Sequence, residues 1–154
     1  MKKIMMMLGL LTSMSVFSLE TTTCTVKDGG FGTGGPDRVV IEWGIIKKNT
    51  GDSRYTFAET QEAHIQFLTG RAVQSLDVTF QNTGIPVHCG RICRDGYKDS
   101  KADLSSPWQE LVIHEDFAES FSHTSQSMTG TLTILSNGAR VPTVFHLTCI
   151  DSEN

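Results

Sequence analysis

The chain consists largely of short runs in which apolar and polar residues alternate, and this period of two most constrains its fold. Val, Ile, Thr and Phe recur within the runs, while Gly, Asn, Asp and Pro separate them. Such a pattern is typical of short strands that bury one face. We count about seven or eight candidate strands. The sequence therefore predicts an all-β fold, either a small antiparallel β-sandwich or a small closed barrel.

Three runs have a clear apolar face. These faces are, in chain order, Thr22, Cys24 and Val26; Val39, Ile41, Trp43 and Ile45; and Leu76, Val78 and Phe80. Residues 55–68 fit either a strand or a helix, and residues 83–106 are predicted to be a loop. The segment 108–121 begins like a helix, but the alternation around Leu111 favours a strand over about 110–115, followed by a short turn or a single helical turn.

The end of the chain predicts a β-hairpin. Asn137-Gly138 lies between two alternating runs, and both residues tolerate the positive φ that a two-residue hairpin turn requires. Such a turn pairs Ser136 with Ala139 and sets Pro142 opposite Thr133. One face then carries Leu132, Ile134, Val141, Phe145, Leu147 and Cys149.

Residues 1–18 have the pattern of a cleavable signal peptide. Lys2 and Lys3 precede an apolar run over residues 4–11, and Val16-Phe17-Ser18 fits a cleavage site. A membrane anchor would need about 20 apolar residues, and this run is shorter. A lipoprotein would need a Cys at the cleavage point, whereas the first Cys is Cys24. We expect residues 19–154 to form a single β domain that is periplasmic or secreted.

The charge of the chain excludes some partners. Seventeen acidic residues against 13 basic ones give a net charge of −4, and loss of the signal peptide would make it two units more negative. A chain of this charge lacks the basic surface that binds nucleic acid. No later segment is apolar enough to span a membrane, and no motif indicates a cofactor.

Four cysteines predict two disulfides in an oxidising compartment. Cys24 and Cys149 lie on the inward faces of the first and last predicted strands, so their pairing would tie the ends of the domain together. Cys89 and Cys93 would then close a small local ring. The alternative crosses each of these two to one terminal strand. A metal site at His88, Cys89 and Cys93 is the other hypothesis, but it shows one cysteine pair where structural zinc sites usually show two, so we expect no metal.

The segment around Cys89 and Cys93 is also a candidate recognition loop. It is locally basic and carries an aromatic residue, and its candidate contact residues are His88, Arg91, Arg94, Tyr97 and Lys98. The alternative is an ordinary solvated loop, because three aspartates nearly cancel its charge.

No motif identifies a catalytic residue. His114-Glu115 resembles half of a zinc-protease motif, but Ala118 stands where the second His is needed, and there is no G-x-S-x-G elbow. We expect a non-enzymatic exported domain that binds a protein or a cell-envelope component, with inhibition of a target as one form of that binding. The alternative is a small hydrolase or metal-binding enzyme. Its site would use acidic residues and some of His64, His88, His114, His123 and His146.

Overall fold

A computed structural model describes residues 20–29, 34–44, 59–85, 88–89, 93–119, 124–136 and 138–152. For residues 88–89, 93, 118–119 and 124–125 the description is limited to the backbone. The predicted signal peptide, residues 1–18, lies outside the described residues. No helix within the described ranges is long and apolar enough to cross a membrane.

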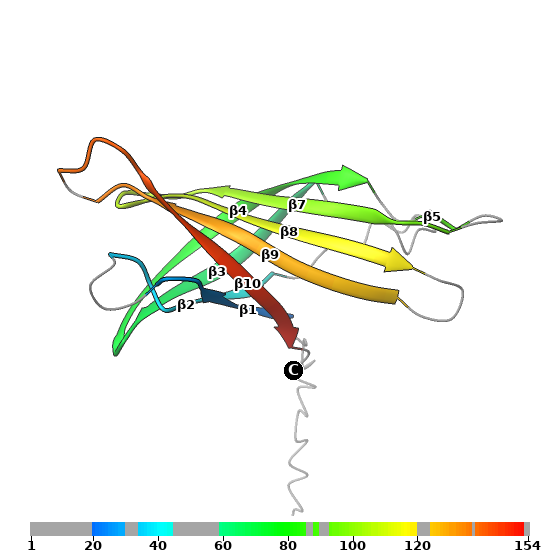
Figure 1. Cartoon of the computed structure of the whole chain (residues 1–154), viewed down its shortest axis with the longest axis horizontal. Helices are drawn as coiled ribbons and strands as arrows, with labels where there is room; N and C mark the ends of the chain where they lie inside the picture. The colour runs from blue at the N-terminus through cyan, green and yellow to red at the C-terminus, as the bar shows by residue number, and fades with distance from the viewer. Residues whose placement is uncertain are drawn as a thin grey trace, which may run out of the picture.

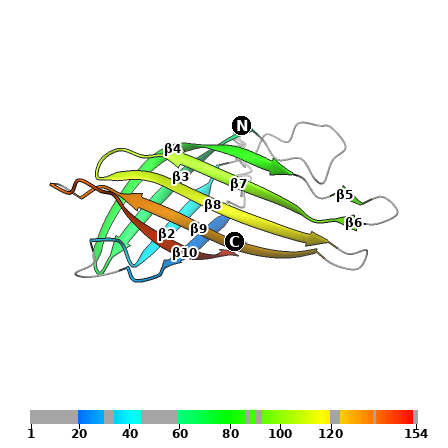
Figure 2. The ribbon, with the colours of Figure 1, turned by 45° about the horizontal axis from the view of Figure 1, so that its top comes forward.

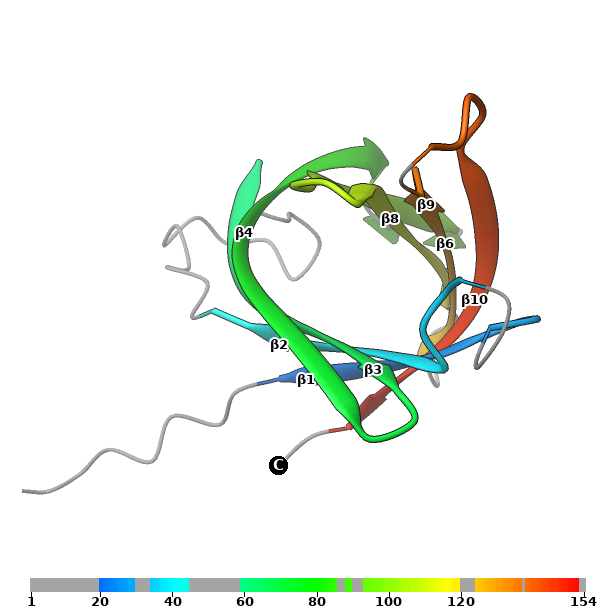
Figure 3. The same ribbon diagram turned by 90° about the vertical axis from the view of Figure 1, so that its left-hand side faces the viewer.

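Eight antiparallel strands close into a barrel, and they follow one another around it in chain order (Figure 3). Two further strands, β5 and β6, form a small separate hairpin at one end of β7 (Figure 2). The bounds are β1 Thr21–Val26, β2 Arg38–Trp43, β3 Thr60–Thr69, β4 Ala72–Ile85, β5 His88–Cys89, β6 Cys93–Arg94, β7 Gly96–Asp103, β8 Trp108–Glu119, β9 Thr124–Ile134 and β10 Thr143–Ser152. The all-β prediction is confirmed, and of its two architectures the chain adopts the closed barrel.

The first and last strands close the barrel against each other (Figure 1). The β1–β10 register runs from Thr21 opposite Ser152 to Val26 opposite Leu147. Within it Cys24 lies opposite Cys149, and the two form a disulfide. The predicted bond between the ends of the domain is confirmed, and it spans the seam where the barrel closes.

The alternating apolar faces fill the interior of the barrel. Large side chains such as Phe67, Phe80 and Ile41 are fully buried there. The three predicted faces point inward where they are described, although Leu76 and Val78 are only partly buried; Ile45 lies outside the described residues. An eight-stranded barrel is just narrow enough for side chains to fill, which explains why this core is packed.

The two ends of the interior differ in polarity. At the end where β8 begins, Trp108 stacks on Phe67 with ring centroids 4.1 Å apart. Pro36 is buried there, and a Cβ on Gly35 would lie 2.6 Å from the Phe145 ring, so the segment before β2 packs tightly on that ring. This end is therefore closed by apolar groups. Polar and charged side chains occupy the opposite end.

The predicted loop over residues 83–106 is wrong, because β4 continues to Ile85 and β7 covers Gly96–Asp103. The inward positions of β7 are Gly96, Lys98, Ser100 and Ala102, none of them a large apolar residue. An apolar alternation is therefore missing from β7, although the strand pairs with β4 and β8 on its two sides.

Two other segments are strands where the sequence left a choice. Residues 60–69 form β3, and residues 55–58 lie outside the described residues. The strand favoured over 110–115 is confirmed, and β8 extends it to Trp108–Glu119. The turn or single helical turn predicted after residue 115 is wrong, because the strand continues there and pairs with β9.

The C-terminal hairpin differs from the prediction in its register, and of the six residues predicted to share its inward face all but Val141 are buried. Thr143 pairs with Ile134, which shifts the partners by two residues and leaves Val141 exposed. The Leu135 amide donates to the Pro107 carbonyl, 2.9 Å away, and so does not join the β9–β10 ladder. A shift of two residues keeps every side chain on its face. Asn137 lies outside the described residues.

Candidate functional site

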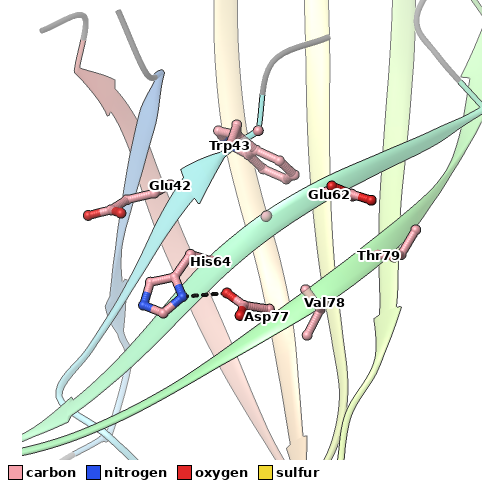
Figure 4. Close-up of a pocket in the computed structure, with 9 residues that line it drawn as sticks. Glu42, Trp43, Glu62, His64, Asp77, Val78 and Thr79 are labelled. Atoms are coloured by element: carbon pink, nitrogen blue, oxygen red, sulfur yellow. Dashed lines mark hydrogen bonds and ion pairs between the residues drawn. The ribbon is translucent and has the colours of Figure 1, made fainter. Parts of the chain in front are cut away.

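An open cavity of about 570 Å³ lies on the wall of the barrel over β2, β3 and β4 (Figure 4). Its polar lining comes from alternate positions of these strands: Glu42, Glu62, His64, Asp77 and Thr79. Between them come residues whose side chains belong to the core, among them Trp43 and Ala63. The strand period of two thus gives this wall an acidic outer face and an apolar inner one.

The β-sheet register brings three of these side chains into one row. Glu42 lies opposite His64, and His64 lies opposite Asp77. The His64 Nδ1 is 2.6 Å from the Asp77 Oδ1, and the dashed line in Figure 4 marks this contact. Directly opposed side chains on adjacent strands are close enough to interact, which explains how residues 35 positions apart in the chain share one site.

The cavity suits the binding of a cation better than the catalysis of a reaction. Three carboxylates and one imidazole line it, so the local charge is negative whichever form the imidazole takes. In a Ser-His-Asp triad the Asp is buried and fixes the His. Here the Asp77 side chain is 90% exposed and that of His64 is 37% exposed. No hydroxyl or thiol contact to His64 is found among the described residues.

A polar network closes the interior of the barrel near the end of β2. The Trp43 Nε1 donates to the Thr22 Oγ1, 2.7 Å away, and this hydroxyl donates in turn to Asp151. On the other side of the Trp43 ring lies Lys98, whose Nζ is 5.7 Å from the ring centroid and 2.7 Å from the Glu115 Oε1. The side chains of this ion pair are only 14% and 7% exposed.

Gln126 joins the two arms of this network. Its amide nitrogen lies 3.4 Å from the Glu115 Oε2 and 3.2 Å from the Asp151 Oδ2. Burial raises the pKa of the Glu115 carboxyl above its ordinary value, while Lys98 beside it lowers it in part. A buried ion pair rarely adds net stability over an apolar packing, but removal of one partner leaves the other charge buried without compensation.

The network and the cavity share the residue Trp43. Trp43 belongs to both, because it contributes to the cavity lining and its indole is held between Thr22 and Lys98. The Gly44 amide next to it donates to the Glu62 carbonyl, 2.8 Å away. A Cβ on Gly44 would lie 2.8 Å from that same oxygen, so the close approach of β2 and β3 here depends on glycine.

Of the predicted recognition residues, Lys98 lies apart from Arg94 and Tyr97. Tyr97 and Arg94 are exposed, whereas Lys98 points into the barrel and pairs with Glu115. Arg91 and the His88 side chain lie outside the described residues. The side chains of Cys89 and Cys93 also lie outside the described residues, but the β5–β6 register sets these two residues opposite each other.

The three histidines whose side chains are described do not converge. His64, His114 and His146 lie on the outer faces of β3, β8 and β10, which are not neighbours in the barrel. His123 lies outside the described residues. Within the described ranges, no group of three or more His, Cys, Asp or Glu side chains could hold a metal ion.

Comparison of the chain with protein-family models, curated proteins and solved structures finds no match.

Sequence reasoning missed most of the cavity. The sequence indicates His64 only as one of several scattered histidines, and it does not indicate Glu42, Glu62 and Asp77 as its neighbours. These residues lie on the same face of three paired strands, and the sequence shows this only when the β2–β3–β4 register is known.

Proposed function

We propose that this chain is a non-enzymatic exported binding domain, and that its cavity on β2–β4 receives a basic group of a protein or cell-envelope component. The observation that supports the proposal is the cavity itself, in which Glu42, Glu62 and Asp77 surround a space of about 570 Å³. A lysine or arginine side chain carries the complementary charge. Carboxylates that accept from such a group form charge-assisted hydrogen bonds, which also set the orientation of the bound group.

The proposed location is the periplasm or the extracellular space, reached through cleavage of the signal peptide at residues 1–18. The buried Cys24–Cys149 disulfide is compatible with such an oxidising compartment. The pairing of Cys89 with Cys93 belongs to the same proposal. Residues directly opposite each other in an antiparallel pair have Cα atoms about 4.5–5.5 Å apart, within the range that a disulfide spans.

The net charge of −4 supports a basic partner as well. A negative field around the barrel would speed the encounter with a basic surface, and salt would weaken that effect. If the partner is an enzyme, occupation of its surface by the barrel would inhibit it, which is the inhibitory form of the same binding function.

Titration with lysine amide tests the cavity directly. We expect saturable binding, followed by NMR, that Glu62→Gln/Asp77→Asn weakens about tenfold, because exposed ion pairs contribute up to about 1 kcal/mol each. Asp103→Asn removes an exposed carboxylate elsewhere, on β7, and serves as the matched control. Equal weakening by the control variant, or no binding of lysine amide, would contradict the proposal.

The His64–Asp77 contact favours one alternative function, a small hydrolase in which Asp77 orients His64 as a base. This alternative predicts turnover of ester, peptide or glycoside test substrates that His64→Gln abolishes. The binding proposal predicts no turnover by the wild-type protein.

A further inference from the structure

Two large apolar side chains lie exposed side by side on the barrel wall, on the opposite side of β4 from β3. Ile85 at the end of β4 is 57% exposed, and its register partner Tyr97 on β7 is 37% exposed. Both point outward, since their neighbours Gly84 and Lys98 point inward. Tyrosine is one of the residues that are enriched at interface hot spots.

The backbone beneath this pair is held closely. Gly84 has a φ of +145°, and a Cβ on it would lie 2.1 Å from the Tyr97 carbonyl oxygen. Only glycine permits this approach of β4 to β7. On the inner side of the same wall, Lys98 forms its buried ion pair with Glu115. The two apolar side chains therefore lie on a part of the wall where β4 and β7 approach each other closely.

An acidic cluster borders the apolar pair on β7 and β8. The His114 Nδ1 is 2.6 Å from the Asp99 Oδ1, and its Nε2 is 3.1 Å from the Asp116 Oδ1. The trio combines two carboxylates with one imidazole, so its net charge is negative whether or not the imidazole is protonated. The Tyr97 ring centroid is 5.9 Å from that of His114, which makes the apolar pair and the acidic trio one continuous surface.

We infer that this surface, named here the β4–β8 face and made of Ile85, Tyr97, Asp99, His114 and Asp116, docks a protein segment in which an aliphatic side chain lies beside a lysine or arginine. The inference rests on the proposed function in one respect, namely that the chain acts as a binding domain. The aliphatic side chain would pack on Ile85 and Tyr97, and the cation would lie against the Asp99 and Asp116 carboxylates.

Charge complementarity selects this occupant. Asp116 is 62% exposed and Asp99 is 38% exposed, so both carboxylates are accessible to a cation from solution. An anionic lipid surface would be repelled by these carboxylates and by the net charge of the chain. The face and the cavity lie on opposite sides of β4, and each would contact a different basic group of the partner.

The experiment is an NMR titration of the intact protein with a blocked tetrapeptide of alternating leucine and lysine. Its leucine–glutamate counterpart and phosphatidylglycerol vesicles serve as the other two probes. We expect the lysine peptide to shift the amide signals of Ile85, Tyr97 and His114, and Ile85→Ser/Tyr97→Ser to weaken that binding about tenfold. Val144→Ser, which alters an exposed apolar residue on β10, should leave binding unchanged.

Three outcomes would overturn the inference: equal binding of the glutamate peptide, tighter binding of the vesicles, or no loss of affinity in the serine variant. Thermal unfolding of each variant verifies the fold, and Asp99→Asn/Asp116→Asn tests the charge separately with the same expected loss. Binding of lysine amide to the wild-type protein measures the cavity. Binding of the tetrapeptide to the β4–β8 face is measured in the Glu62→Gln/Asp77→Asn variant, in which the cavity is weakened. Failure of the face and failure of the proposed cavity are thus distinguishable.

Discussion

Removal of the Cys24–Cys149 disulfide should cost this domain a large part of its stability. The bond joins residues 125 positions apart, so in the unfolded chain it closes a loop that contains nearly the whole domain. In the chain-entropy model, closing a loop of this length lowers the entropy of the unfolded state by about 16 cal/mol/K. That corresponds to about 5 kcal/mol at 25 °C, against about 5–15 kcal/mol for the net stability of a typical domain.

The disulfide contributes little to holding the folded state together. Both cysteines are buried in the barrel, and their strands are already paired by the β1–β10 ladder. The bond therefore acts mainly by restricting the unfolded chain and not by holding together strands that would otherwise separate. Cys24→Ala/Cys149→Ala should then fold to the same barrel with a much lower unfolding free energy.

Urea unfolding followed by circular dichroism measures the effect. With a urea dependence of about 1.5 kcal/mol/M, a loss of 5 kcal/mol lowers the midpoint by about 3 M. Cys89→Ala/Cys93→Ala is the matched control. A disulfide between these two residues would close a loop of only a few residues, and it would contribute only about 2 kcal/mol to the unfolding free energy. A midpoint lowered by less than about 1 M in the first variant, with an unchanged slope, would refute the reasoning.

Three further predictions concern the interior and the β4–β8 face. Lys98→Met should lower the unfolding free energy by about 3 kcal/mol, because it leaves the Glu115 carboxylate buried without its cation; a double-mutant cycle with Glu115→Leu should recover most of the loss. The pKa of Glu115 is raised in the fold, so its contribution to stability is complete below pH 4.5 and is lost as the pH rises through the folded pKa; Glu115→Gln should remove this part of the pH dependence in urea titrations. The hydrogen bond to Asp99 raises the pKa of His114, so its contribution is complete below pH 6.5 and is lost above the folded pKa, and an unchanged pH profile in His114→Gln would contradict this.

Sequence pattern predicted the strands whose inward faces are apolar and missed the one whose inward face is not. The inward residues of β7 include Lys98 and Ser100, and neither contributes to an apolar alternation. Both are buried because β4 and β8 enclose β7 on its two sides. The Ser100 Oγ has no hydrogen-bond partner among the described residues, and no local pattern would place a hydroxyl there. Burial of this kind is a property of the closed barrel and not of the segment.

The candidate sites depend on register in the same way. The Asn137-Gly138 pattern predicted Ser136 opposite Ala139, yet β9 and β10 pair in a register that is shifted by two residues, and the Leu135 amide donates to Pro107 instead of joining the ladder. Likewise His64 and Asp77 are neighbours only because β3 and β4 pair in one particular register. The Cys24–Cys149 pair could be predicted because both residues lie on the inward faces of their strands. The site across β2, β3 and β4 could not be predicted, because it depends on the register in which the three strands pair.

The measurement that tests the central claim most directly is a set of intermolecular NOEs between lysine amide and the isotope-labelled protein. If the cavity on β2–β4 binds basic groups, the methylene protons next to the ligand ammonium should give NOEs to the side chains of Glu62 and Thr79, and these should vanish in Glu62→Gln/Asp77→Asn. NOEs located elsewhere on the barrel, or equally strong NOEs in the variant, would contradict the account.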